Sequence, residues 1–245
     1  MQQQRNISPR MQAITISREY GSGGGEIARR VAERLQWRLV DHEIVVQVAQ
    51  SLEISEEEAT ARDEHSDSVV ARILSSMHGV DPSLMIVSPV QMPVDAEQYN
   101  DALRKAVHGA VANGHVVIVG RGSQVLLANR RDVLHVRIVA PMKQRIYYVM
   151  QREGLDEDSA RSRIQVKDRD RQRYLQNEYH IQSEDPHHYD IVVNTGILDL
   201  DSVVELITVA LERKASRLTA PSAQLGPGVG LSRYPTQPAD FHPPE

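Results

Sequence analysis

A glycine-rich turn that follows a short apolar run is the feature of this sequence that most restricts its fold. Residues 13–17 have the β-rich pattern of a strand, and an amphipathic helix is predicted after the turn by Ile27, Val31 and Leu35, which are spaced by four. Glycines let backbone N–H groups approach phosphate oxygens, and a helix N-terminus presents its positive dipole end at the same place. The pattern therefore predicts a phosphate site, with a ligand-free turn as the alternative. The turn consists of Gly21, Ser22, Gly23, Gly24 and Gly25.

This turn departs from the phosphate-loop pattern G-x-x-x-x-G-K-[ST]. A fitting register places Arg18 at the first glycine, Gly24 at the lysine and Gly25 at the Ser/Thr. The two groups that hold the terminal phosphate and Mg²⁺ are therefore missing from their usual positions. We expect Arg18 to supply the cation from the other side of the turn, with Ser17 or Ser22 supplying a hydroxyl.

Short β-rich runs alternate with longer helical runs along the chain. This alternation predicts an α/β fold with a parallel five-stranded sheet flanked by helices, whose ligands bind beyond the carboxyl ends of the strands. The predicted strands are residues 13–17, 38–40, 115–119, 133–139 and 189–194.

The domain organisation follows from composition and length. Residues 1–11 are polar and predict a disordered leader, and residues 216–245 are rich in Pro and Gly and predict a disordered tail. Between them, residues 12–215 suffice for one well-cored domain. A capping-box pattern, Ser55 with Glu58, opens a predicted helical insertion at about 55–95.

Composition excludes several classes of partner. The formal net charge of −5 argues against a general polyanion binder, and a single Trp and a single Phe argue against stacking on nucleic acid. No apolar run approaches the roughly 20 residues that span a bilayer, and the N-terminus lacks a signal-peptide core. The chain has no cysteine, which suits a reducing compartment. We therefore expect a cytoplasmic protein without nucleic-acid or membrane partners; nothing in the sequence indicates its oligomeric state.

Two residues at predicted strand ends are candidates for ligand binding. Arg121 follows the apolar strand at 115–119, where a guanidinium can hold a phosphate bidentately; a surface salt bridge is the alternative. Asp41 ends the second strand and can bind an acceptor or, through water, Mg²⁺. It can equally be the N-cap of a segment that starts at His42.

A basic helix is predicted near residues 156–180. Helical spacing places Arg163, Lys167 and Arg171 on one face, which can close over transferring phosphates. The alternative is a solvated helix with its charges balanced by Asp168 and Asp170. Neighbouring His187 and His188 lack metal-ligand spacing, so no protein metal site is expected.

The run Ile16 to Gly24 resembles the opening signature of the bacterial cytidylate kinase-like family, which comprises P-loop nucleoside monophosphate kinase relatives with a lysine-less loop. Later segments are similar in the same order over residues 12–212. Val40-Asp41 resembles the edge of that family's monophosphate pocket, and Gly120-Arg121-Gly122 resembles the Gly-Arg-Asp turn of true cytidylate kinases. Asp168 with Arg171 and Tyr174 resembles the lid-helix pattern.

The resemblance implies a P-loop kinase fold with a lid helix, and phosphorylation of CMP or dCMP with ATP and Mg²⁺. In that reading Arg18 and the glycine turn hold the donor phosphates, while Arg121, Asp41 and Asp168 hold the acceptor. Arg18, Arg163 and Arg171 act in catalysis. Gly122 stands where true cytidylate kinases have the Asp of Gly-Arg-Asp, which helps to read the acceptor nucleotide. Two other functions therefore stay open: a nucleotide-binding sensor without phosphoryl transfer, and a kinase for a non-nucleotide small acceptor.

Overall fold

The computed structural model describes residues 10–41, 96–221 and 224–226. The predicted insertion at 55–95 and the residue after Asp41 lie outside the described residues, as do most of the predicted leader and tail. Met11, which the prediction places in the leader, is completely buried in the core.

Strands and helices alternate as the sequence pattern predicts. The strands are β1 (Ala13–Arg18), β2 (Arg38–Val40), β3 (Val116–Val119), β4 (Val133–Val139) and β5 (Ile191–Asn194). The helices are α1 (Gly24–Leu35), α5 (Ala96–Ala112), α6 (Ser123–Leu126), α7 (Met142–Glu153), α8 (Glu157–Tyr179) and α9 (Leu200–Ser216), with a 3₁₀ turn η2 (Pro186–His188) before β5.

The described strands form one parallel sheet in the order β2-β3-β1-β4-β5. The strand that precedes the glycine turn is therefore central, with β3 and β4 on its two sides. Two predicted strands were too long at their first residues. His115 has a positive φ of 52° and lies outside β3, while Tyr189 follows η2 and precedes β5.

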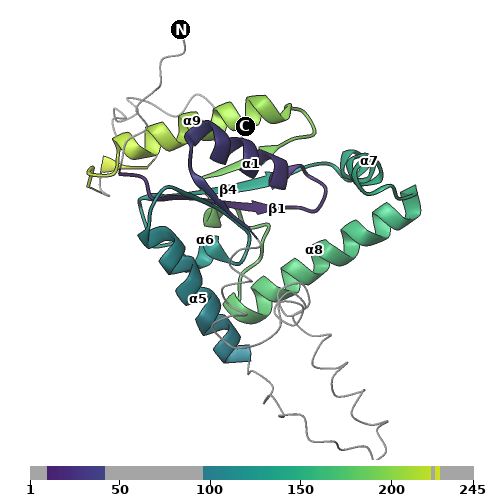
Figure 1. The fold of residues 1–245 in the computed structure, drawn as a ribbon, viewed down its shortest axis with the longest axis horizontal. Coiled ribbons are helices and arrows are strands. Elements are labelled where there is room, and N and C mark those ends of the chain that lie inside the picture. Colours follow the sequence, from purple (N-terminus) through teal and green to yellow (C-terminus); the bar gives the residue numbers. More distant parts are fainter. Residues whose placement is uncertain (1–9, 42–95, 222–223, 227–245) are drawn as a thin grey trace, which may run out of the picture.

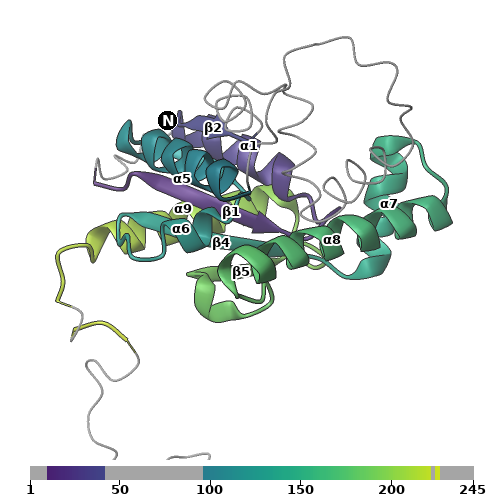
Figure 2. The ribbon, with the colours of Figure 1, turned by 90° about the horizontal axis from the view of Figure 1, so that it is seen from below.

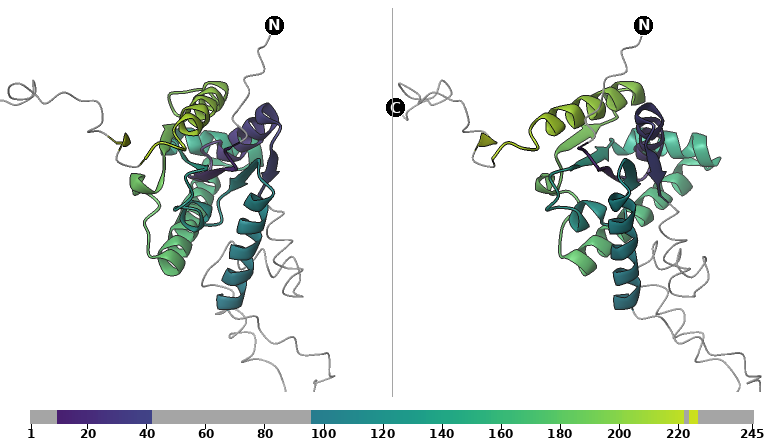
Figure 3. Two further views of the ribbon diagram at one scale, coloured as in Figure 1. Left: turned by 90° about the vertical axis from the view of Figure 1, so that its left-hand side faces the viewer. Right: turned by 60° about the vertical axis from the view of Figure 1, so that its left-hand side comes forward.

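Helices cover both faces of the sheet, as a parallel sheet requires. Helices α1 and α9 pack on one face and α5 and α6 on the other (Figures 1 and 3). Alternation along β1 serves both layers, since Ile14 and Ile16 belong to the α1 side and Ala13 to the α5 side. Because successive side chains of a strand point to opposite faces, the apolar strands contribute to two apolar cores, one on each face of the sheet.

Helices α7 and α8 lie beyond the carboxyl ends of β1 and β4 (Figures 1 and 2). They pack on each other through a small apolar cluster containing Val149 and Ile164. Asp156 caps α8 by accepting a hydrogen bond of 2.9 Å from the N–H of Ser159, and His180 ends the helix in a left-handed conformation. The predicted lid at about 156–180 is therefore a single long helix placed over the ligand-binding edge of the sheet.

Candidate active site

The glycine turn forms a tight loop between β1 and α1. Gly21 and Gly23 have φ values of 80° and 79°, in the left-handed region that favours glycine. The first intrahelical bond runs from the N–H of Ile27 to the carbonyl of Gly23, so the N–H groups of the first turn of α1 have no acceptor within the helix. This end of α1 has the geometry that the sequence predicted for phosphate binding.

Ser22 supports the loop from within. Its hydroxyl donates to the carbonyls of Glu19 (2.9 Å) and Ile138 (3.3 Å), and its N–H also donates to Glu19. Both donors of Ser22 are therefore occupied by backbone oxygens. The loop turns this side chain inward, so of the two predicted hydroxyls, Ser17 and Ser22, it is Ser17 that lines a cavity.

Arg18 passes between two glycines. A Cβ at Gly24 would lie 2.7 Å from Cβ of Arg18, and a Cβ at Gly120 would collide with its Nη1. The position at which a phosphate loop usually has lysine is thus empty of side chain, and the stem of Arg18 fills that space. An ion pair of 3.9 Å joins Arg18 to Asp41, while burial lowers the pKa of the guanidinium. Arg18 is the cation that the loop itself brings to the site.

A charged cluster that the sequence did not predict fastens the loop to the lid. The carboxylate of Asp168 accepts a 2.7 Å hydrogen bond from the N–H of Tyr20 and a further bond from Nη1 of Arg145. Arg145 also donates to the carbonyl of Tyr20 (3.3 Å) and lies 3.6 Å from Glu19. Because Arg145 is only 8% exposed, these bonds are shielded from water and hold the loop against α7 and α8.

Two cavities open on either side of this cluster. The larger, of about 440 Å³, lies between the lid and the ends of β1, β3 and β4; the smaller, of about 430 Å³, lies along the glycine loop and α7. Both volumes suit small-molecule ligands. Five residues line both cavities, so the cavities meet at them: Arg18, Glu19, Tyr20, Asp41 and Arg171.

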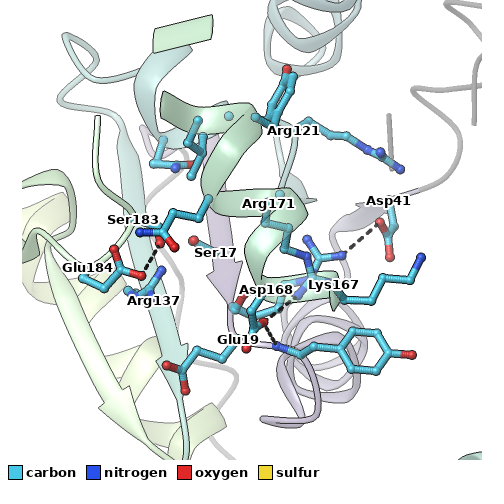
Figure 4. Close-up of a pocket in the computed structure, with 18 residues that line it drawn as sticks. Ser17, Glu19, Asp41, Arg121, Arg137, Lys167, Asp168, Arg171, Ser183 and Glu184 are labelled. Atoms are coloured by element: carbon cyan, nitrogen blue, oxygen red, sulfur yellow. Dashed lines mark hydrogen bonds and ion pairs between the residues drawn. The ribbon is translucent and has the colours of Figure 1, made fainter. Parts of the chain in front are cut away.

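The larger cavity gathers the predicted acceptor residues. Asp41, Arg121 and Asp168 all line it, together with Lys167 and Arg171 from the lid (Figure 4). Burial lowers the pKa of Arg121 and of Arg171 to about 10 each, and both side chains therefore remain positively charged at neutral pH. The cavity is suited to an anion.

The three basic residues predicted on one face of the lid helix do not all lie at the cavities. Arg171 bonds to the carbonyl of Arg18 (3.5 Å) and stacks over the ring of Tyr20 at 5.4 Å. Arg163 instead donates to Glu153 at 2.6 Å and lines neither cavity. The structure thus places Arg163, which was predicted to lie over the phosphates, against α7 and away from both cavities. The reason is that α7 supplies a carboxylate beside the first turns of α8.

Gly122 explains the departure from the Gly-Arg-Asp pattern. It has φ 63°, and a Cβ there would lie 2.5 Å from Cε2 of Tyr179. The hydroxyls of Tyr179 and Tyr174 are 3.4 Å apart, and burial raises the pKa of both. An aromatic pair from the end of the lid thus fills the space in which an aspartate side chain would stand.

Sequence reasoning missed three buried polar residues: Gln124, Arg137 and Arg145. Arg137 had a visible signal, since it is a charge inside the apolar run of β4. Arg145 and Gln124 had none, because a polar residue on a helix is usually exposed. Among residues 10–41, 96–221 and 224–226, no group of three acidic or histidine side chains is placed to hold a metal ion.

The fold and site define a class of protein, a kinase-like α/β protein with a P-loop type of strand-turn-helix and a lid helix. The family model of the cytidylate kinase-like family matches residues 13–197. The chain therefore belongs to the cytidylate kinase-like family.

Individual relatives are distant. A cytidylate kinase from Staphylothermus marinus is 24% identical over 204 residues, which cover 83% of this chain and 98% of that protein. A segment of 105 residues is 30% identical to a uronate isomerase from Corynebacterium glutamicum, but the match covers 43% of this chain and 20% of that protein's length. The fold is similar to that of an uncharacterized protein from Eubacterium ventriosum, with a TM-score of 0.59, 22% identity and coverage of 82% and 99% of the two chains.

None of the helices in the described part of the chain has the length and apolar character needed to cross a membrane.

Proposed function

We propose that this protein transfers the γ-phosphoryl group of ATP to a nucleoside monophosphate, with CMP or dCMP as the acceptor. The observation that carries the proposal is the meeting of two ligand-sized cavities at Arg18 and Arg171. One cavity follows the glycine loop and fits a donor, and the other contains Arg121 and fits an anionic acceptor. A phosphoryl group passing from one to the other would cross the two shared arginines.

The residues supply charge and placement. The free N–H groups at Gly24 and Gly25, together with Arg18, hold the β- and γ-phosphates of ATP, and Arg121 holds the acceptor phosphate. An oxygen of the acceptor phosphate attacks the γ-phosphorus, the bond from that phosphorus to the β-bridging oxygen breaks, and ADP leaves. No general base is needed because the attacking oxygen is already anionic. Arg171 stabilises the charge on the transferring group.

Mg²⁺ would enter with ATP. It prefers oxygen ligands and commonly keeps several waters beside one or two carboxylates and the nucleotide phosphates. Asp41 fits this role because its carboxylate is 45% exposed and lines both cavities. When bound, Mg²⁺ supplies charge neutralisation at the β- and γ-oxygens.

A panel of acceptors tests the proposal. Purified protein with ATP and Mg²⁺ is incubated with each common nucleoside monophosphate, and ADP formation is followed. We expect turnover with CMP or dCMP, and its loss in Arg121→Ala. An Arg161→Ala variant is the matched control, since Arg161 is exposed, pairs with Glu157 and lines neither cavity. ATP binding without turnover for any acceptor would instead favour a nucleotide sensor or a kinase for a non-nucleotide acceptor.

A further inference from the structure

Two buried polar side chains in the larger cavity have no role in the transfer just described. Arg137 on β4 is 5% exposed and Gln124 on α6 is 3% exposed, and both line the cavity. In the described part of the chain, neither side chain makes a hydrogen bond or an ion pair; the guanidinium of Arg137 only faces the ring of Tyr189 at 5.6 Å. Buried polar groups are almost always satisfied, so two such groups beside a cavity indicate a polar ligand.

The surroundings of Arg137 form a built wall. Arg137 is paired with Ser17 across β1 and β4, so both side chains lie on the same face of the sheet. The hydroxyl of Tyr189 donates to the carbonyl of Ser183 (3.0 Å) and contacts Oγ of Ser17 (3.3 Å), which fixes the ring behind the guanidinium. Glu184 stands at the rim and accepts a 3.0 Å hydrogen bond from Ser183.

This wall lies across the cavity from Lys167 of the lid and from Asp41, the ion-pair partner of Arg18. Figure 4 shows Arg137, Ser183 and Glu184 on one side of the cavity and Asp41 and Lys167 on the other. An acceptor whose phosphate is bound near Arg121 and Arg18 would therefore extend its other end toward this wall.

The charges of the wall select the chemistry of that end. The guanidinium of Arg137 only donates hydrogen bonds, a carboxylate such as Glu184 only accepts them, and the amide of Gln124 does both. Because the wall combines a cation with a carboxylate, a second phosphate or carboxylate on the acceptor would be repelled by Glu184. A neutral group that carries both acceptors and donors is complementary to all three side chains.

We propose that Arg137, Gln124 and Glu184 form the subsite that recognises the base of the acceptor nucleotide, and that they fit the polar edge of cytosine. This inference rests on the proposed function. Arg137 donates to the ring nitrogen or carbonyl oxygen of cytosine, and Glu184 accepts from its amino group. Uracil presents an oxygen in place of that amino group and an N–H in place of the ring acceptor, so the contact of Glu184 and any contact of Arg137 with the ring nitrogen would be lost, while the carbonyl oxygen is common to both bases. The subsite would recognise the base in place of the aspartate that is absent at position 122.

Binding measurements without ATP test the subsite. CMP, UMP and ribose 5-phosphate are titrated by calorimetry into the wild type, Arg137→Met, Gln124→Leu and Glu184→Gln. Arg161→Met serves as the control for loss of an arginine. For the wild type we expect CMP to bind about 10²-fold more tightly than UMP, because a site built for hydrogen bonds rejects a ligand that leaves them unpaired.

The variants should lower this preference to about tenfold or less, without changing the affinity for ribose 5-phosphate, which has no base. Glu184 is exposed at the rim of the cavity, so Glu184→Gln should fold. It therefore still tests the subsite if a substitution of buried Arg137 or Gln124 prevents folding. A preference for CMP that survives Arg137→Met and Glu184→Gln would overturn the subsite. Equal losses for CMP and ribose 5-phosphate would also overturn it.

The outcome is separable from that of the kinase assay. If the wild type prefers CMP and the variants abolish that preference while no ADP forms, the subsite stands and the proposed transfer falls. If the wild type binds CMP no more tightly than ribose 5-phosphate, the subsite falls, whichever acceptor is phosphorylated.

Discussion

Alanine at Gly21 and alanine at Gly25 are expected to have opposite effects, although both glycines belong to one run. Gly21 has φ 80°, and an added Cβ would lie 2.9 Å from Cγ2 of Val149 and 3.0 Å from the carbonyl oxygen of Arg145. Gly25 is exposed in the first turn of α1, and an added Cβ there meets no atom within 4 Å.

The magnitudes follow from these contacts. At Gly21 a left-handed conformation costs a non-glycine residue about 1–2 kcal/mol. Forcing α7 away from the loop costs about 1–3 kcal/mol more. Gly21→Ala should therefore lower the free energy of unfolding by about 2–5 kcal/mol. Gly25→Ala should raise it by about 0.5–1 kcal/mol, because alanine loses less backbone entropy in a helix.

Urea denaturation followed through the single tryptophan, Trp37, measures both changes, and ATP titration measures the site. Gly25→Ala keeps the N–H group that faces the donor cavity, so its ATP affinity should stay within about twofold of the wild type. Gly21→Ala should weaken ATP binding as well as stability. A loss below about 1 kcal/mol for Gly21→Ala, or equal losses for both variants, would refute the view that α7 sets the loop conformation.

Three further predictions concern the lid, the acceptor turn and a buried histidine. Arg171→Ala should lower kcat about 10²–10³-fold with little change in ATP affinity, measured by steady-state kinetics and titration; equal losses would remove Arg171 from the transfer step. Gly122→Asp should lower the free energy of unfolding by about 1–3 kcal/mol through collision with Tyr179, and a Tyr179→Ala background should relieve that loss in a double-mutant cycle. Burial lowers the pKa of His135 to about 4. Between pH 4 and about 6.5 the unfolded chain therefore binds more protons than the folded protein. The free energy of unfolding should be unaffected by this histidine above that range and should fall by about 3 kcal/mol as the pH drops through it. Urea denaturation at pH 7 and 4.5 checks this, and His135→Leu should flatten the dependence if the imidazole causes it.

Local pattern predicted the architecture well. The strands at 38–40 and 133–139 match the structure at both ends, and the lid helix with its caps occupies the predicted range. These elements depend on side-chain periodicity, capping residues and turn residues, all of which act within a few neighbouring positions. Both cavities lie at the carboxyl end of the central strand β1, which is the edge of a parallel sheet where ligands are expected.

The candidate site was predictable only in part. Arg18, Asp41, Arg121 and Arg171 do line the cavities, since the first three lie at or just after strand ends and Arg171 lies on the lid helix. Arg163 shares its helical face with Arg171 but pairs with a carboxylate of α7, and helical spacing alone carries no information about that neighbour.

The sequence by itself determined the elements, their alternation and the cations available to bind phosphate, because those properties depend on residues close together in the chain. Only the tertiary structure decided which of the glycines are sterically required, because Gly21, Gly24 and Gly122 are confined by side chains from α7, β1 and the end of α8. It also decided that Arg137 and Gln124, which come from different elements, line one cavity and make no hydrogen bond or ion pair with the residues that the structure describes. Such arrangements arise from packing between segments that are distant in the sequence. Residue spacing cannot predict them, because the space around each side chain is set by elements elsewhere in the chain.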